Sequence, residues 1–304
     1  MQRAKIAAAV EGRPVKDMVM DLVETHLKEL EKKCLLPKGK VESMQSVPMD
    51  WKNIESYQDD SSIYRGHRCA AWPLETSLER ACKRLYDNSL EKIIKMETTL
   101  SREFRRRYHH YSTIVPRSDE PLRWLSLMQH HGAPTRLLDW TYSIYVASYF
   151  ALEYATHDCA IWKINKKWLN DVAEESFQKA GRTTELFRNR DEKIEGDFQE
   201  NVLDRELREP INAVIQIGPF HLDERLTIQK GVFLYPCRAV ETFEANLNAM
   251  PGASDPSNVQ KLTIQHREHP QVLKMLHSMN ISRATLFPGL DGFAQSLKVY
   301  HPLL

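Results

Sequence analysis

Signatures of several common enzyme classes are missing from this sequence. Its 304 residues contain no G-x-G-x-x-G, no G-x-x-x-x-G-K-[ST], no H-E-x-x-H and no G-x-S-x-G. These patterns serve dinucleotide and nucleoside triphosphate binding, zinc proteolysis and serine hydrolysis. The usual nucleotide-binding, metalloprotease and α/β-hydrolase interpretations therefore lose support.

Cysteine is scarce, and its spacing matches neither a disulfide framework nor a zinc-binding motif. The count is odd, and no two cysteines form a C-x-x-C pair; the five are Cys34, Cys69, Cys82, Cys159 and Cys237. We therefore expect neither a disulfide framework nor a zinc site, but small buried hydrophobic residues.

The adjacent histidines at 109/110 and 130/131 would point about 100° apart on a helix, so they cannot chelate together. No metal site is expected.

Long apolar runs and a strong charge of one sign are also lacking. No run reaches about 18 apolar residues, and the apolar stretch near the N-terminus is too short for a signal peptide. The formal net charge is +1, which gives no global attraction to nucleic acid or membranes. We expect a cytoplasmic protein without a membrane partner, whose electrostatic preferences come from local patches.

The patterns that are present predict an α+β fold. Strand-like segments occur at 61–67, 136–140, 159–164, 212–218 and 231–237. Helical spacing covers 74–111 as one or two helices, then 120–132, 143–155 and parts of 269–301. The strands lack the regular alternation with helices that a doubly wound parallel sheet requires.

Two regions differ from this central pattern. Residues 16–33 have the apolar spacing of an amphipathic helix, within an N-terminal helical extension that we place at 1–46. Residues 166–209 carry 12 acidic and 9 basic side chains, which predicts a solvated, charged insertion within a domain at 47–304.

The densest polar cluster is "QHHGAPTRLLDWT", residues 129–141. Asp139 lies between apolar residues, so it is either buried with a donor such as Arg136, exposed to a cleft, or the N-cap of the next helix. A nuclease using Asp139, Arg65 and His130 or His131 is one interpretation that these residue types leave open.

Five motifs together resemble the FRG domain, a family named for a (Phe/Tyr)-Arg-Gly triplet. In the order of that family they are "YRG", "QHHGAPTRLLDWT", "VASYFA", "RLTIQKGVF" and "LFPGLDG", and they span roughly residues 47–300. The family occurs largely in bacterial proteins and is poorly characterised. A role as a bacterial toxin or phage-defence effector, held in check by an antitoxin or another partner protein, is implied by this resemblance alone.

The order of three of these motifs is also similar, more distantly, to that of ADP-ribosyltransferases. This similarity implies a split mixed β-sheet surrounded by helices, with NAD as co-substrate and no Rossmann motif. It implies catalytic roles for Arg65, Asp139 and Gln229. The residues that it places at NAD are Tyr64, Arg65, Gly66, His131, Arg136, Thr141 and Tyr142. Arg65 would grip the diphosphate or ribose, and Gly66 would let the backbone approach the nicotinamide amide.

One departure from the transferase pattern bears on turnover. Aligning "IQKGVFLYP" with the late strand of these enzymes puts Gln229 at its first position and Gly231 where a catalytic Glu is expected. Asp139, Glu224 or a substrate group would have to replace that carboxylate. Without a replacement, the chain would be a non-catalytic nucleotide- or RNA-binding module.

The acceptor is indicated by a basic segment. Residues 101–136 hold seven arginines and three acidic residues, and "SREFRRRYHHY" interleaves tyrosines with them. Such a composition suits phosphates and base stacking, although a solvated helix face has the same pattern. We predict that an RNA acceptor, favoured over DNA or protein, is bound by Arg105, Arg106, Arg107 and Tyr108. The leading alternatives are the non-catalytic binding module and a metal-independent nuclease.

Overall fold

The structure is a computed structural model that describes residues 46–300, except 88, 189–190, 192, 207–208, 220 and 222, with backbone only at 298–300. The described residues belong to one compact unit, Met44–Leu304. The amphipathic helix expected at 16–33 lies outside them.

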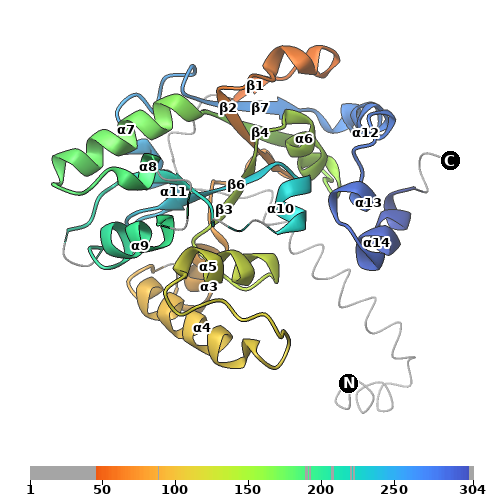
Figure 1. Cartoon of the computed structure of the whole chain (residues 1–304). Coiled ribbons are helices and arrows are strands. Elements are labelled where there is room, and N and C mark those ends of the chain that lie inside the picture. Colours follow the sequence, from red (N-terminus) through yellow and green to blue (C-terminus); the bar gives the residue numbers. More distant parts are fainter. Residues whose placement is uncertain are drawn as a thin grey trace. The chain divides into compact units, whose positions relative to one another are not determined.

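One mixed sheet organises the fold, and helices surround it (Figure 1). The strand order is β1-β7-β4-β2-β3-β6-β5, in which only β1 and β7 run parallel. The strands are β1 (Ser46–Pro48), β2 (Ser62–His67), β3 (Leu138–Thr141), β4 (Cys159–Asn165), β5 (Val214–Ile217), β6 (Gly231–Pro236) and β7 (Val259–Ile264). The α+β class is confirmed. Strands β1 and β7 were not among the predicted segments.

The sheet is nearly divided at its centre. Strands β2 and β3 share only the pair Tyr64 and Thr141, whereas β2 pairs with β4 along six residues. Beyond that single pair the two strands separate. The side chain of Arg65 enters the separation, where its Nη1 donates to the Asp139 carbonyl.

The helices of the first half are α3 (Ser77–Leu85), α4 (Ile93–Tyr108), α5 (Pro121–His130), α6 (Ile144–Leu152) and α7 (Lys166–Lys179). Those of the second half are α8 (Glu185–Arg188), α9 (Ile194–Phe198), α10 (Glu224–Ile228), α11 (Phe243–Asn248), α12 (His269–Ser278), α13 (Arg283–Leu286) and α14 (Leu290–Tyr300). The 3-10 helices η1 (Trp51–Tyr57) and η3 (His266–Glu268) and the π-helical turn η2 (Gln199–Leu203) complete the chain. The segment predicted as one or two helices at 74–111 is two, α3 and α4.

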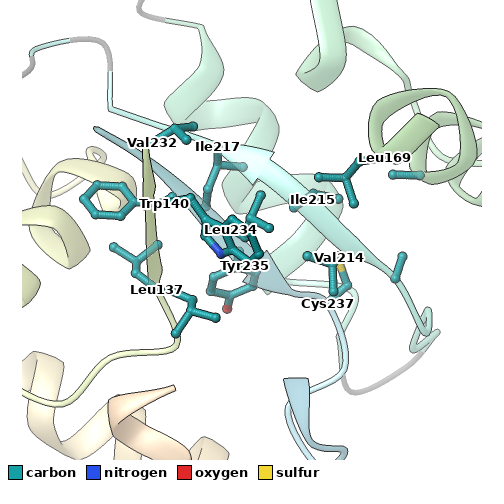
Figure 2. Close-up of a cluster of buried hydrophobic side chains, with 14 of the residues drawn as sticks. Leu137, Trp140, Leu169, Val214, Ile215, Ile217, Val232, Leu234, Tyr235 and Cys237 are labelled. Atoms are coloured by element: carbon teal, nitrogen blue, oxygen red, sulfur yellow. The ribbon is translucent and has the colours of Figure 1, made fainter. Parts of the chain in front are cut away.

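Two buried clusters hold the sheet on its opposite faces. Helices α6 and α12 pack with Tyr64 and its neighbours on one face. The larger cluster joins β3, β5 and β6 to α7, and Figure 2 shows Trp140, Leu169, Ile215 and Leu234 within it. Burial of this apolar surface supplies the main driving force for folding.

The segment 166–209 differs from the expected solvated insertion. It contributes seven buried apolar residues to the larger cluster, namely Leu169, Ala173, Phe177, Leu186, Ile194, Phe198 and Val202. The charged majority masked these anchors in the sequence, because one apolar residue per helical turn is enough to bury one face. The segment is therefore part of the domain core.

Four of the five cysteines fall in the described residues, and all four are buried and free, as expected of small hydrophobic residues. Among the helices described here, none has the combination of length and apolar character that crossing a bilayer requires.

Candidate functional site

Arg65 lies where β2 and β3 separate, and its contacts are to the protein itself. Its Nη1 donates to the backbone carbonyl of Asp139, and its Nε donates to Nε2 of His67 at 3.2 Å. Burial lowers the pKa of Arg65 to about 10, against the opposing influence of the Asp139 charge, so the guanidinium stays protonated at neutral pH. Arg65 thus braces the divided sheet.

His67 fixes the orientation of Arg65. Its side chain is buried, and burial, then the charges of Arg65 and Lys261, hold its pKa well below the usual range. The imidazole is therefore neutral, and the nitrogen that faces Arg65 is an acceptor. The sequence placed His67 directly after the Tyr-Arg-Gly triplet but gave no sign of this role.

The side chains of Arg65 and Asp139 lie on opposite faces of the sheet. Tyr64 pairs with Thr141, so these two share one face, and Asp139, two residues before Thr141, shares it too. Arg65 pairs with Trp162 and takes the other face. The expected meeting of the Arg65 guanidinium with the Asp139 carboxylate in one cleft is therefore replaced by a contact through the Asp139 backbone.

The Asp139 carboxylate is exposed and held in place from α5. Gln129 donates to its Oδ2 at 2.6 Å, and Thr135 donates to the amide oxygen of Gln129 at 2.6 Å. Because Thr135 fixes which end of the amide points to Asp139, the carboxylate keeps one orientation. The cap alternative for Asp139 is wrong, because Ser143 caps α6 through a bond from Val146.

A small open pocket of about 60 Å³ lies beside this carboxylate, between α5 and α10. Its lining residues are Ser126, Gln129, His130, Asp139, Asp223, Arg225, Leu226, Gln229 and Phe233. The structure therefore brings Asp139 and Gln229 together, although about 90 residues separate them in the sequence. Arg65 is not among the lining residues.

Asp223 connects two features of the pocket. Its Oδ1 accepts from the Leu226 backbone as the N-cap of α10, and its Oδ2 lies 3.3 Å from Nδ1 of His130. One carboxylate thereby starts the helix and orients an imidazole at the pocket wall. No role for Asp223 was predicted from the sequence.

Arg225 supplies the positive charge of the pocket. Its guanidinium stacks 4.5 Å from the ring centre of Phe287, and burial lowers its pKa while the charges of Asp139 and Asp223 oppose that effect. Arg225 falls in the segment "RLTIQKGVF", but no role was predicted for it from the sequence. The signal available in the sequence was the basic residue four positions before Gln229, because this spacing puts both residues on one side of a short helix.

Gln229 ends α10 and ties three segments together. Its Nε2 donates to the Leu286 carbonyl at 2.9 Å, and its own carbonyl accepts from the Thr141 hydroxyl at 2.7 Å. Gly231, where the transferase pattern has a Glu, starts β6 against Leu226, whose Cδ1 would lie 2.3 Å from an added Cβ. A side chain at position 231 would require Leu226 to move, and the two carboxylates that line this pocket are Asp139 and Asp223.

Other residues predicted to bind NAD have contacts that hold the fold. Tyr64 is fully buried, and its hydroxyl donates to the Tyr57 carbonyl at 2.7 Å. Gly66 lies under α6, where an added Cβ would meet the Ala147 carbonyl oxygen at 2.1 Å. The glycine therefore permits close helix packing, and α6 occupies the space that the resemblance assigned to nicotinamide.

The Arg136 side chain is also buried and makes its contacts within the protein. Its side chain is 1% exposed, and its guanidinium forms ion pairs with Glu97 and Glu206, each at 2.6 Å. It also stacks on Tyr235, 4.6 Å from the ring centre. The expectation that Arg136 satisfies Asp139 is wrong, because both of its carboxylate partners are glutamates from other segments.

The last two predicted NAD contacts lie at the ends of elements. His131 follows α5, with its ring 6.5 Å from that of Phe104. The Tyr142 hydroxyl accepts from Gln216 at 2.8 Å, and its backbone carbonyl accepts from Gln58. Neither residue lines the pocket beside Asp139.

The predicted acceptor residues do not share one surface. Arg105 turns inward, 5.3 Å from the ring centre of Trp124, and Tyr108 packs edge-on against the same ring at 5.4 Å. Arg106 and Arg107 point to solvent, where both contact Glu103. Consecutive helix positions differ by about 100°, so Arg105 and Arg107 point in nearly opposite directions and the four predicted residues cannot form one surface.

Comparison with known proteins adds one match. Residues 60–159 match the family model of the FRG domain, a stretch that begins just before β2 and ends as β4 starts. The match includes Arg65, Gln129 and Asp139, and it excludes Arg225 and Gln229. Neither the curated proteins nor the solved structures yield a match. About a third of the chain is thus similar to the FRG domain.

Proposed function

We propose that this chain transfers ADP-ribose from NAD to an acceptor, with the pocket between α5 and α10 as the reaction site. The observation that carries the proposal is the exposed Asp139 carboxylate, which Gln129 holds in place beside Arg225. A carboxylate stabilises the positive charge that develops on ribose when nicotinamide leaves. A guanidinium binds a diphosphate.

The size of the pocket decides how NAD is held. About 60 Å³ accommodates roughly two water molecules, so NAD has to lie across the mouth of the pocket. We assign the diphosphate to Arg225. The Gln229 amide nitrogen is committed to the Leu286 carbonyl, so its amide oxygen is the group that accepts from a ribose hydroxyl. Arg65 acts as a positioning residue, because it holds the Asp139 backbone from the opposite face.

In the proposed reaction the bond between C1′ of ribose and the nicotinamide nitrogen breaks, and nicotinamide leaves with the electron pair. Asp139 stabilises the oxocarbenium-like transition state, and a nucleophile of the acceptor attacks C1′. The proton of that nucleophile passes to His130, which Asp223 orients. The products are nicotinamide, the ADP-ribosylated acceptor and one proton.

The test is incubation of the purified chain with NAD labelled in its adenylate phosphate, in the presence of separate RNA, DNA and protein pools. We expect release of nicotinamide and retention of label in one pool. Asp139→Asn keeps the size of the side chain and removes its charge, so turnover should fall at least about a hundredfold with little change in NAD affinity. Asp171→Asn, an exposed carboxylate on α7, is the matched control. Absence of both nicotinamide and label in every pool would refute the proposal.

A cellular test follows from the toxin interpretation. If the transferase activity harms its host, induced expression of the wild-type chain should stop bacterial growth, and Asp139→Asn should restore it at equal protein level. Growth arrest that persists in the Asp139→Asn variant would assign the toxicity to another feature of the chain.

A second candidate is favoured by the His130 and Asp223 pair. An imidazole held 3.3 Å from a carboxylate, next to Arg225, is also the arrangement of a general base for metal-independent phosphodiester cleavage. A nuclease would cut RNA in the presence of EDTA and without NAD, and His130→Ala would abolish cleavage. Parallel incubations of the RNA pool with EDTA and without NAD, analysed for RNA length, separate this candidate from the transferase.

A further inference from the structure

The outward face of α4 carries a row of cations along the whole helix. Lys95, Arg102 and Arg106 follow one another at spacings of seven and four residues, so they lie on one side, with Arg107 next to them. The side chains of Arg102, Arg106 and Arg107 are 66%, 69% and 63% exposed. We call the surface formed by Lys95, Arg102, Arg106 and Arg107 the α4 basic row.

The inner contacts of α4 fix the direction in which this row points. Phe104 and Tyr108 pack on Trp124 of α5, and Glu97 binds the buried Arg136. In Figure 1 helix α4 lies on the outer side of α3 and α5. Because the inner face is held by these contacts, the basic row faces solvent.

The carboxylate within the row does not neutralise it. Glu103 lies within 4 Å of Arg102, Arg106 and Arg107, with the shortest distance, 2.6 Å, to Arg107. The hydrogen bond from Arg107 lowers the pKa of Glu103, so the carboxylate stays ionised. Three guanidinium groups around one carboxylate leave a local charge of about +2, and Lys95 adds to it.

Hydroxyl and aromatic groups accompany the cations. Thr98 and Thr99 are exposed between Lys95 and Arg102, and the Thr98 hydroxyl donates to the Ile94 carbonyl, which leaves its oxygen as an acceptor. Tyr111, just past the end of α4, is 85% exposed. Acceptors for a 2′-hydroxyl and an exposed ring for an unpaired base are features that suit single-stranded RNA.

We propose that the α4 basic row binds single-stranded RNA and delivers it to the pocket at Asp139. The helix of 16 residues is about 24 Å long, enough to contact several successive phosphates. The inner face of the same helix is connected to the pocket by ring contacts, from Phe104 to His131 and from His131 to His130. The inference rests on the proposed function for the modification of the RNA and stands apart from it for binding.

The test measures binding without NAD, so it is independent of turnover. A fluorescein-labelled single-stranded RNA of mixed sequence is titrated with the full chain at several salt concentrations, and fluorescence anisotropy is recorded. The Arg102→Gln, Arg106→Gln, Arg107→Gln triple variant should bind at least about tenfold more weakly in 0.1 M salt. Its salt slope should fall by about 2, since each lost phosphate contact removes roughly 0.7 of a unit.

The matched control removes the same charge from another helical surface. The triple variant Lys167→Gln, Lys179→Gln, Arg188→Gln changes side chains that are 80%, 70% and 65% exposed on α7 and α8. It should keep the wild-type affinity within about twofold. Equal losses in the two triple variants would reduce the effect to net charge and overturn the proposal, as would absence of binding by the wild-type chain.

Further titrations identify the ligand class. Single-stranded DNA of the same sequence, duplex RNA and an acidic polypeptide should each bind more weakly than the RNA, and Tyr111→Ala should weaken RNA binding severalfold. Equal affinity for the acidic polypeptide would overturn the assignment to RNA. RNA binding without nicotinamide release would refute the transferase and leave this inference standing. Label transfer that persists in the Arg102, Arg106, Arg107 variant would overturn this inference and leave the transferase standing.

Discussion

Arg65 donates to the backbone carbonyl of Asp139 and leaves the carboxylate of that residue to Gln129 on the opposite face of the sheet. Asp139 thus has two roles, which its backbone and its side chain perform on different sides of the sheet. The Asp139 backbone completes the divided sheet, and the Asp139 side chain faces the pocket.

This relationship predicts different consequences for the two residues. Arg65→Met keeps an unbranched apolar stem but removes the bonds to the Asp139 carbonyl and to His67, so the free energy of unfolding should fall by about 2 kcal/mol. Asp139→Asn keeps the backbone acceptor and should change it by less than about 0.5 kcal/mol. Urea unfolding of both variants measures the difference. A loss in Asp139→Asn as large as that in Arg65→Met would mean that the carboxylate, and not the carbonyl, holds Arg65.

The buried Arg136 should be essential for stability. Arg136→Met leaves Glu97 and Glu206 without their common cation in a buried site, which typically costs about 3–5 kcal/mol. We expect the variant to melt far below the wild type or to fail to fold. Arg188→Met, which removes an exposed partner of Glu174, should cost less than about 1 kcal/mol in the same thermal melt. A mild effect at Arg136 would show that the core hydrates around the two glutamates.

Gly66 should not tolerate even one added methyl group. Its added Cβ would meet the Ala147 carbonyl oxygen at 2.1 Å and the Ala151 nitrogen at 2.6 Å, both backbone atoms of α6. Gly66→Ala therefore forces the helix away from β2 and should cost several kcal/mol, of the size seen for overpacked cores. Gly196→Ala in α9, where no heavy atom lies within 4 Å of the new Cβ, should be neutral or stabilising. Thermal melts compare the two variants, and a Gly66→Ala protein as stable as the wild type would mean that α6 moves away from β2 without cost.

Stability should depend on pH through Glu195. This carboxyl group accepts from the backbone nitrogens of Leu122 and Arg123 at the start of α5, and burial raises its pKa to about 7 despite these bonds. Between pH 4.5 and 7 the folded chain therefore holds a proton that the unfolded chain has lost, so the contribution of Glu195 to the free energy of unfolding declines as pH rises through this window.

The measurement is urea unfolding of the wild type and of Glu195→Gln at pH 5, 6, 7 and 8. The variant should be less stable than the wild type at pH 5, because an amide accepts only one of the two backbone bonds well. The difference between the two proteins should shrink toward pH 7, by at most about 1.4 kcal/mol per pH unit. A difference that is constant across the range would mean that Glu195 is ionised throughout.

The sequence by itself determined the α+β class, the central strands and most helices, because apolar periodicity and Gly or Pro breaks are local properties. It also predicted the similarity to the FRG domain, which the family match confirms for residues 60–159, and it pointed to Asp139 as a polar residue within an apolar strand. Strand β7 was not predicted, because Gln260 and Lys261 interrupt the alternation of its apolar residues, and the apolar anchors of 166–209 were masked by charge.

Only the tertiary structure decided what each motif residue does. Whether Arg136 meets Asp139 or two glutamates, and whether Gly66 faces a ligand or a helix, depends on segments far away in the chain. The pocket has the same origin, since Gln129, Asp139 and Arg225 come from α5, β3 and α10. Periodicity assigns a side chain to a face of its own element, but the partner on that face is set by long-range strand pairing and helix packing.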